Sequence, residues 1–125
     1  MDINRKILIV DDDKNVALML QNYFQSQDIT ADVASDLPSV LNQLDSVAFN
    51  LIFLDYRMCP HTGKDILERL KILGVKIPVI MMSAYKRSEA VYEMKRLGAS
   101  EYIAKPYNFE EIDRILKAYL PPVQE

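Results

Sequence analysis

Three runs of four apolar residues in this chain each lead directly into a polar side chain. They are residues 7–10 followed by Asp11, residues 51–54 followed by Asp55, and residues 79–82 followed by Ser83. Runs this short, separated by segments with helical spacing, are typical of strands that are buried on both faces of a parallel sheet. The chain is therefore expected to alternate between strand and helix, with a polar group at the end of each strand.

Between these runs, apolar residues recur at the spacing of a helix. The predicted helices cover approximately residues 14–27, 37–44, 66–73, 91–97 and 109–119. Gly74, Gly98 and Pro121 are expected to end the last three of them. Short strands near residues 30–34 and 102–104 bring the number of strands to five. Five strand–helix units predict an α/β domain with a doubly wound five-stranded parallel sheet and right-handed crossovers.

Length and charge limit what this chain can do. Its 125 residues fit one domain, with a core of about residues 5–120 and a tail or the start of a linker at 121–125. A net charge of −3 and a pI of about 5.2 give no electrostatic reason to expect nucleic acid binding by this segment. Glu110 and Arg114 lie four residues apart on the last predicted helix, which predicts a solvated, ion-paired face.

The cysteine content and the absence of long apolar segments bear on the compartment. A single cysteine, Cys59, excludes an internal disulfide and fits a reducing environment. No apolar segment approaches the roughly 20 residues that span a bilayer. The polar start of the chain leads straight into a strand, unlike a signal or transit peptide. We therefore expect a cytoplasmic protein without a membrane segment.

The polar groups at the strand ends predict one common site. In an open parallel sheet, ligands bind outside the carboxyl ends of the strands. Asp11, Asp12 and Asp55 would meet there, and neighbouring carboxylates repel one another unless a cation neutralises them. Oxygen donors without a histidine or cysteine cluster favour Mg²⁺. The alternative for the acidic run after the first strand is capping of the first helix, and this applies best to Asp13.

The remaining strand-end residues have the chemistry needed for phosphoryl transfer. A carboxylate such as Asp55 can act as a nucleophile toward phosphorus. Lys105 supplies a mobile positive charge, and Ser83 supplies a hydroxyl for a phosphoryl oxygen. Phosphoryl transfer depends mainly on positioning and charge neutralisation. The combination is more specific than any one of these residues.

With these residues the chain resembles a known family, the receiver domains of two-component response regulators. The resemblance extends over about residues 5–120. It rests on the first strand with its acidic pair, the Asp55 segment, and residues at the family's spacing beyond it. Those residues are Gly63, Ser83, Tyr102, Lys105 and Pro106. The resemblance implies the flavodoxin-like (βα)5 receiver fold.

The resemblance also implies a phosphorylation switch that depends on Mg²⁺. The ion would be held by Asp12, Asp55 and the backbone carbonyl of Arg57, with Asp11 reaching it through water. Asp55 would be the phosphoacceptor, and Lys105 would pair with the phosphate. Its bond to Pro106 is cis in similar proteins.

Two further residues would carry the switch in such a protein. Ser83 would move toward the phosphoryl group, and Tyr102 would turn into the space that Ser83 leaves. The output would be read on the last two helices and the fifth strand.

The partners implied are a sensor histidine kinase or a histidine phosphotransfer protein as donor, and an output domain or effector protein as target. A homodimer through the last two helices is also implied. Such a module is not an enzyme acting on other substrates. It catalyses only its own phosphotransfer and dephosphorylation.

Two positions near the site give separate expectations. The family loop often has proline four residues after the acceptor, where this chain has Cys59 followed by Pro60. The sequence therefore does not determine the path of the loop after Asp55. Arg57 and Tyr85 occupy positions that flank the attacking water in similar proteins, and a bulky Tyr85 is expected to lengthen the life of the acyl phosphate.

Other functions use some of the same residues. Asp11 and Asp13 resemble the Asp-x-Asp of haloacid dehalogenase-type phosphatases, which also form an aspartyl phosphate. Those enzymes need a further acidic pair that does not follow Ser83, and they leave Asp55 without a role. A pseudo-receiver that only binds proteins has usually lost one of the acidic pair, the acceptor or the lysine, and none of these is lost here. A flavodoxin-like nucleotide-binding protein is disfavoured, because the three glycines form no phosphate-binding loop.

Overall fold

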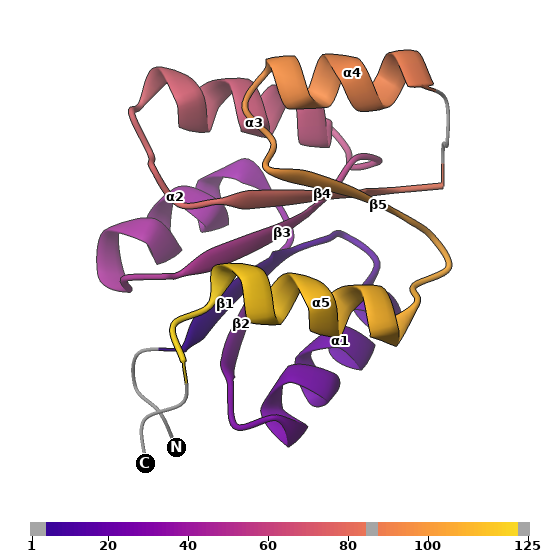
Figure 1. Ribbon diagram of the computed structural model, residues 1–125. Coiled ribbons are helices and arrows are strands. Elements are labelled where there is room, and N and C mark those ends of the chain that lie inside the picture. The colour runs from indigo at the N-terminus through magenta and orange to yellow at the C-terminus, as the bar shows by residue number, and fades with distance from the viewer. Residues whose placement is uncertain (1–4, 85–87, 123–125) are drawn as a thin grey trace.

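The structure is a computed structural model that describes residues 5–84 and 88–122. Strands and helices alternate along the chain, as the apolar pattern predicts (Figure 1). The strands are β1 (Lys6–Val10), β2 (Thr30–Ala34), β3 (Leu51–Asp55), β4 (Val79–Ser83) and β5 (Glu101–Ala104). The helices are α1 (Lys14–Ser26), α2 (Leu37–Ser46), α3 (Gly63–Ile72), α4 (Ser88–Arg96) and α5 (Phe109–Tyr119).

The five strands form one parallel sheet in the order β2-β1-β3-β4-β5. Helices α1 and α5 cover one face of the sheet, and α2, α3 and α4 cover the other (Figure 1). The chain changes direction across the sheet between β1 and β3, which are hydrogen-bonded neighbours. Ligands of open α/β sheets bind at such a switch point. The doubly wound fold predicted from the sequence is confirmed.

Alternate residues of the central strands point to opposite faces and build two cores. Ile7, Ile9 and Phe53 belong to the core beneath α1 and α5. Leu8 and Leu54 belong to the core beneath α2, α3 and α4. Both faces of the three central strands are buried, so residues 7–10, 51–54 and 79–82 are all apolar until the chain reaches the site.

The helix ends follow from local chemistry. Gly74 and Gly98 have positive φ angles of 74° and 114° just after α3 and α4, which is the conformation in which glycine ends helices. Helix α3 begins with a capping box between Thr62 and Asp65. Of the described helices, none is long and apolar enough to cross a membrane.

Candidate functional site

Three aspartates gather at the carboxyl end of the sheet. Asp11 directly follows β1, and Asp55 is the last residue of the neighbouring strand β3. One carboxylate oxygen from each of Asp11, Asp12 and Asp55 lies within 4.8 Å of the others. Asp11 and Asp55 are only 1% and 4% exposed, whereas Asp12 is open to solvent. The structure therefore brings together the acidic cluster that the sequence predicts.

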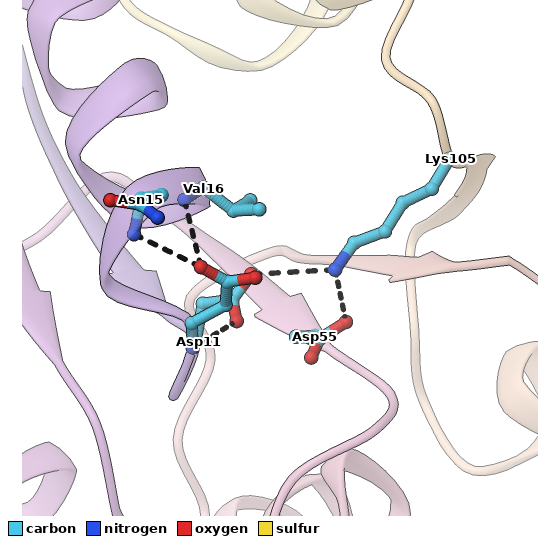
Figure 2. A network of polar contacts seen from close by, with 6 residues as sticks. Asp11, Asn15, Val16, Asp55 and Lys105 are labelled. Atoms are coloured by element: carbon cyan, nitrogen blue, oxygen red, sulfur yellow. Dashed lines mark hydrogen bonds and ion pairs between the residues drawn. The ribbon is translucent and has the colours of Figure 1, made fainter.

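Lys105 provides the positive charge of this cluster. It follows β5, and its ammonium reaches across the sheet edge to two carboxylates (Figure 2). Its Nζ lies 2.8 Å from Asp55 Oδ1 and 3.4 Å from Asp11 Oδ2. One ammonium cannot balance three ionised carboxylates, so the cluster keeps an excess of negative charge that suits a divalent cation.

The pKa values of the cluster reflect burial and the surrounding charges. Burial raises the pKa of Asp11 to about 6, and the charge of Asp55 adds to the rise. The backbone N–H of Asp13 and the ammonium of Lys105 act in the opposite direction. Burial lowers the pKa of Lys105, but its contacts with Asp55 and Asp11 outweigh this and leave the pKa above its usual range. Lys105 therefore stays protonated, while Asp11 ionises at a higher pH than an ordinary aspartate.

Asp13 is the N-cap of helix α1. Its side chain accepts hydrogen bonds from the backbone N–H groups of Asn15 and Val16, at 3.0 and 3.3 Å. The backbone N–H of Asp13 donates to Asp11 Oδ1 at 2.9 Å, which orients the Asp11 carboxylate. The acidic run thus divides into one capping residue and two residues of the cluster.

Ser83 and Tyr102 reach the same region from β4 and β5. Ser83 is the last residue of β4 and is 2% exposed. Its backbone oxygen accepts a hydrogen bond from the backbone N–H of Lys105 at 2.9 Å. Tyr102 is half-buried and packs against the core beneath α2, α3 and α4. Ser83 therefore lies at the end of the strand next to the one that carries Asp55, whereas Tyr102 lies further back in the sheet, paired in register with Met81.

The loop after β3 borders an open cavity of about 800 Å³ beside the cluster. Arg57 and Cys59 line this cavity together with Asp12. The backbone N–H of Cys59 donates to Asp12 Oδ2 at 3.3 Å, so the loop touches the acidic cluster directly. The peptide bonds that precede Pro60 and Pro106 are both cis. Tyr85, which the sequence places near the path of water, lies outside the described residues.

Gly63 allows helix α3 to start against the strand that ends at Asp55. Its backbone N–H donates to the carbonyl oxygen of Tyr56 at 2.9 Å. A Cβ atom on Gly63 would lie only 2.2 Å from the backbone oxygen of Asp55. No side chain fits in this position without a shift of the backbone that carries Asp55.

We expect the Gly63→Ala variant to lose about 1–3 kcal/mol of unfolding free energy, because overpacking against a backbone atom cannot be relieved by a rotamer change. Urea unfolding of the wild type and the variant measures this loss. Gly74→Ala is the contrasting variant: it has open space around the added methyl group, and only its positive φ is unfavourable. Equal stability of Gly63→Ala and the wild type would contradict the close contact.

Tyr107 is a residue of this region that the sequence pattern does not identify. Its ring lies beside the Lys105 ammonium, with Nζ 5.8 Å from the ring centre. The signal in the sequence was only its position two residues after Lys105. An aromatic residue there is equally consistent with core packing, so its place near the ammonium could be found only in the structure.

Comparison with known proteins places this geometry in a family. The family model for the response regulator receiver domain matches residues 7–117. Sporulation initiation phosphotransferase F of Bacillus subtilis is 34% identical over 95% of this chain and 96% of its own length. Regulatory protein AtoC of Escherichia coli is 33% identical over 94% of this chain. The chain spans only 25% of that longer protein.

Solved structures agree with the sequence comparison. The receiver domain of the Francisella response regulator 1452 superposes with a TM-score of 0.86 at 28% identity, over 92% of this chain and 95% of that one. The BeF3-activated DrrB receiver domain gives a TM-score of 0.80 at 28% identity, over 91% and 95% of the two chains. The carboxylates and lysine at the end of a parallel sheet thus occur in a fold and a sequence family that agree. This chain belongs to the response regulator receiver domains, the signalling modules of two-component systems.

Proposed function

We propose that this receiver domain takes a phosphoryl group onto Asp55 in a Mg²⁺-dependent reaction and passes the change to an output partner or domain. The observation that carries the proposal is the surroundings of Asp55. Its carboxylate is buried at the end of a central strand, paired with Lys105 at 2.8 Å and close to Asp11 and Asp12. A carboxylate held in this way is a nucleophile with its charge-neutralising groups already in place.

The transfer itself requires little from the protein beyond position and charge. An oxygen of Asp55 attacks the phosphorus atom of a phosphohistidine, and an O–P bond forms as the N–P bond breaks. The electron pair of the broken bond remains on the imidazole nitrogen of the donor. Lys105 leaves Asp55 and pairs with a phosphoryl oxygen, to which Ser83 donates a hydrogen bond. The domain catalyses this transfer, and the later hydrolysis of its own acyl phosphate, on itself alone.

The acidic cluster fits Mg²⁺ because its donors are all carboxylate oxygens that lie within reach of one ion. Asp12, Asp55 and the backbone carbonyl of Arg57 would hold the ion, with Asp11 acting through a water molecule. The bound ion would neutralise the charge that builds up on the transferred group. Burial and the charge of Asp55 hold the pKa of Asp11 at about 6, so a divalent cation bound here would favour the ionised form of Asp11.

Phosphorylation would be converted into a change of shape at the β4–β5 side of the sheet. Ser83 moves toward the phosphoryl group, and Tyr102 turns into the space that it leaves. Since Tyr102 packs between β5 and the core beneath α4, its rotation alters the surface formed by α4, β5 and α5. That surface would contact an output partner or a second copy of the chain.

The partners follow from this chemistry and from the relatives. The donor would be a sensor histidine kinase or a histidine phosphotransfer protein in the cytoplasm. The chain as a whole, residues 1–125, would act as one receiver domain, with a core of about residues 5–120. Longer relatives such as AtoC, in which the similar segment is a quarter of the length, support a role for an attached or separate output domain.

The intact mass of the protein after incubation with acetyl phosphate and Mg²⁺ tests the proposal. We expect a gain of one phosphoryl group, and no gain when EDTA removes the metal. Mg²⁺ binding is measured in parallel by the change in unfolding temperature. No gain in mass while Mg²⁺ binds would contradict the proposal and indicate a pseudo-receiver that acts by protein binding alone.

A further inference from the structure

The hydroxyl group of Tyr107 is buried, yet within the described part of the chain it has no hydrogen-bond partner. The ring is half-buried and packs against the core beneath α1 and α5. Phenylalanine would fill this space equally well without burying a polar atom that has no partner. Buried hydroxyl groups that lack a partner are uncommon and destabilise the folded state. The hydroxyl therefore calls for a reason that packing does not supply.

The surroundings of the hydroxyl belong to the acidic cluster. Burial raises the pKa of Tyr107 well above its usual range, and the charges of Asp11 and Asp55 raise it further. The ammonium of Lys105 acts in the opposite direction, through its charge and through its close approach to the hydroxyl. The hydroxyl thus lies within the electric field of the three charged groups that surround the acceptor oxygen.

The ammonium of Lys105 must find new partners when Asp55 reacts. An ammonium has three N–H donors, and two of them serve the ion pairs with Asp55 and Asp11. Conversion of Asp55 to an acyl phosphate moves the negative charge from the carboxylate to the phosphoryl oxygens. The ammonium then has to follow this charge while it remains in a partly buried place, where an unsatisfied N–H is costly. Its Nζ is already 5.8 Å from the centre of the Tyr107 ring.

We propose that Tyr107 is a positioning residue for Lys105. Its ring limits the path of the ammonium. Its hydroxyl oxygen accepts a hydrogen bond from one N–H of the ammonium, while the other two N–H groups turn to the phosphoryl group. This inference rests on the proposed function of Asp55. In the free protein the approach of the ammonium to the hydroxyl falls short of hydrogen-bond geometry, and the hydroxyl is then an acceptor that the ammonium reaches fully in the phosphorylated state.

Removal of the hydroxyl alone tests the inference. Tyr107→Phe keeps the ring, and we expect it to take up the phosphoryl group from acetyl phosphate about three to ten times more slowly than the wild type, the effect of one lost hydrogen bond. Its unfolding temperature should be equal to that of the wild type or higher, because a buried polar atom without a partner is gone. Tyr119→Phe is the matched control, since its hydroxyl donates to Glu101 on the far part of β5. Its uptake rate should not change.

A second comparison shows whether Tyr107 acts through Lys105. Tyr107→Phe is placed in a Lys105→Met background, where the ammonium is absent, and the slow residual uptake is followed over longer times. We expect no further slowing there, because no ammonium is present to donate a hydrogen bond to the hydroxyl. A purely structural role would slow both backgrounds equally, and that result would overturn the inference.

The experiments also distinguish a failure of this inference from a failure of the proposed function. If the wild type gains a phosphoryl group and Tyr107→Phe gains it at the same rate, the inference alone is overturned. If the wild type gains none in the presence of bound Mg²⁺, the proposed function fails and the inference fails with it. The wild-type control distinguishes these cases before any variant is compared.

Discussion

Replacement of Asp55 by asparagine should abolish the gain of a phosphoryl group from acetyl phosphate. The amide keeps the shape of the carboxylate and still presents an oxygen to the Lys105 ammonium, so we expect the variant to fold as the wild type does. An amide oxygen is not a competent nucleophile toward phosphorus at neutral pH. Intact mass spectrometry of wild type and variant, treated side by side, measures the difference.

The control for this experiment is Asp45→Asn, which makes the same substitution at an exposed aspartate on α2. This variant should gain the phosphoryl group at the rate of the wild type. Uptake by Asp55→Asn at an undiminished rate would show that another residue is the acceptor, with the exposed carboxylate of Asp12 as the first to examine. Peptide mapping of the modified protein would then locate it.

The largest expected effect on stability involves Asp11 in the metal-free protein. Burial holds the pKa of Asp11 at about 6 in the folded state, against 3.8 for the unfolded chain. Between these values the folded state binds more protons than the unfolded state, so a rise in pH removes stability. The contribution of Asp11 is fully present below about pH 4 and is lost as the pH rises through 6. The loss amounts to at most about 3 kcal/mol.

Asp11→Asn cannot ionise and should lack this pH dependence. We expect the variant to be more stable than the wild type at pH 8 in EDTA, and the difference to shrink toward pH 4. Urea unfolding of both proteins across this range measures the difference curve, in which the contributions of all other groups cancel to first order. Addition of Mg²⁺ at pH 8 should stabilise the wild type more than the variant. A difference that does not change with pH would contradict the raised pKa of Asp11.

Much of the site could be predicted because it depends on strand ends. Apolar runs identify strands that are buried on both faces, and in a parallel sheet their carboxyl ends meet at one edge. Asp55 and Ser83 therefore had to lie near one another, whichever way their side chains turned. In the structure each is the last residue of its strand, so the sheet hydrogen bonds hold both of them. The identity of the family followed from the same few positions.

What the sequence pattern could not supply are contacts that depend on how helices pack. Glu110 and Arg114 suggested an ion pair along α5, yet Arg114 reaches Glu101 on β5 at 3.5 Å. The choice depends on where α5 lies over the sheet, and spacing within one helix does not encode that position. For Asp13 the sequence offered capping as an alternative to the acidic cluster, and the hydrogen bonds of its side chain to the first turn of α1 decide for the cap. Tyr107 could be linked to Lys105 only through the three-dimensional packing.

The order of the strands separates where the domain is rigid from where it can respond. β3, which carries Asp55, is hydrogen-bonded to β1 on one side and β4 on the other. β5, which carries Tyr102 and leads to Lys105, lies at the edge of the sheet and pairs with β4 alone. Local opening costs least where the fewest neighbours must be released. In the proposed function, the covalent event would take place on a strand that two neighbours hold, and the movement that reports it would fall to a strand whose displacement breaks one ladder only.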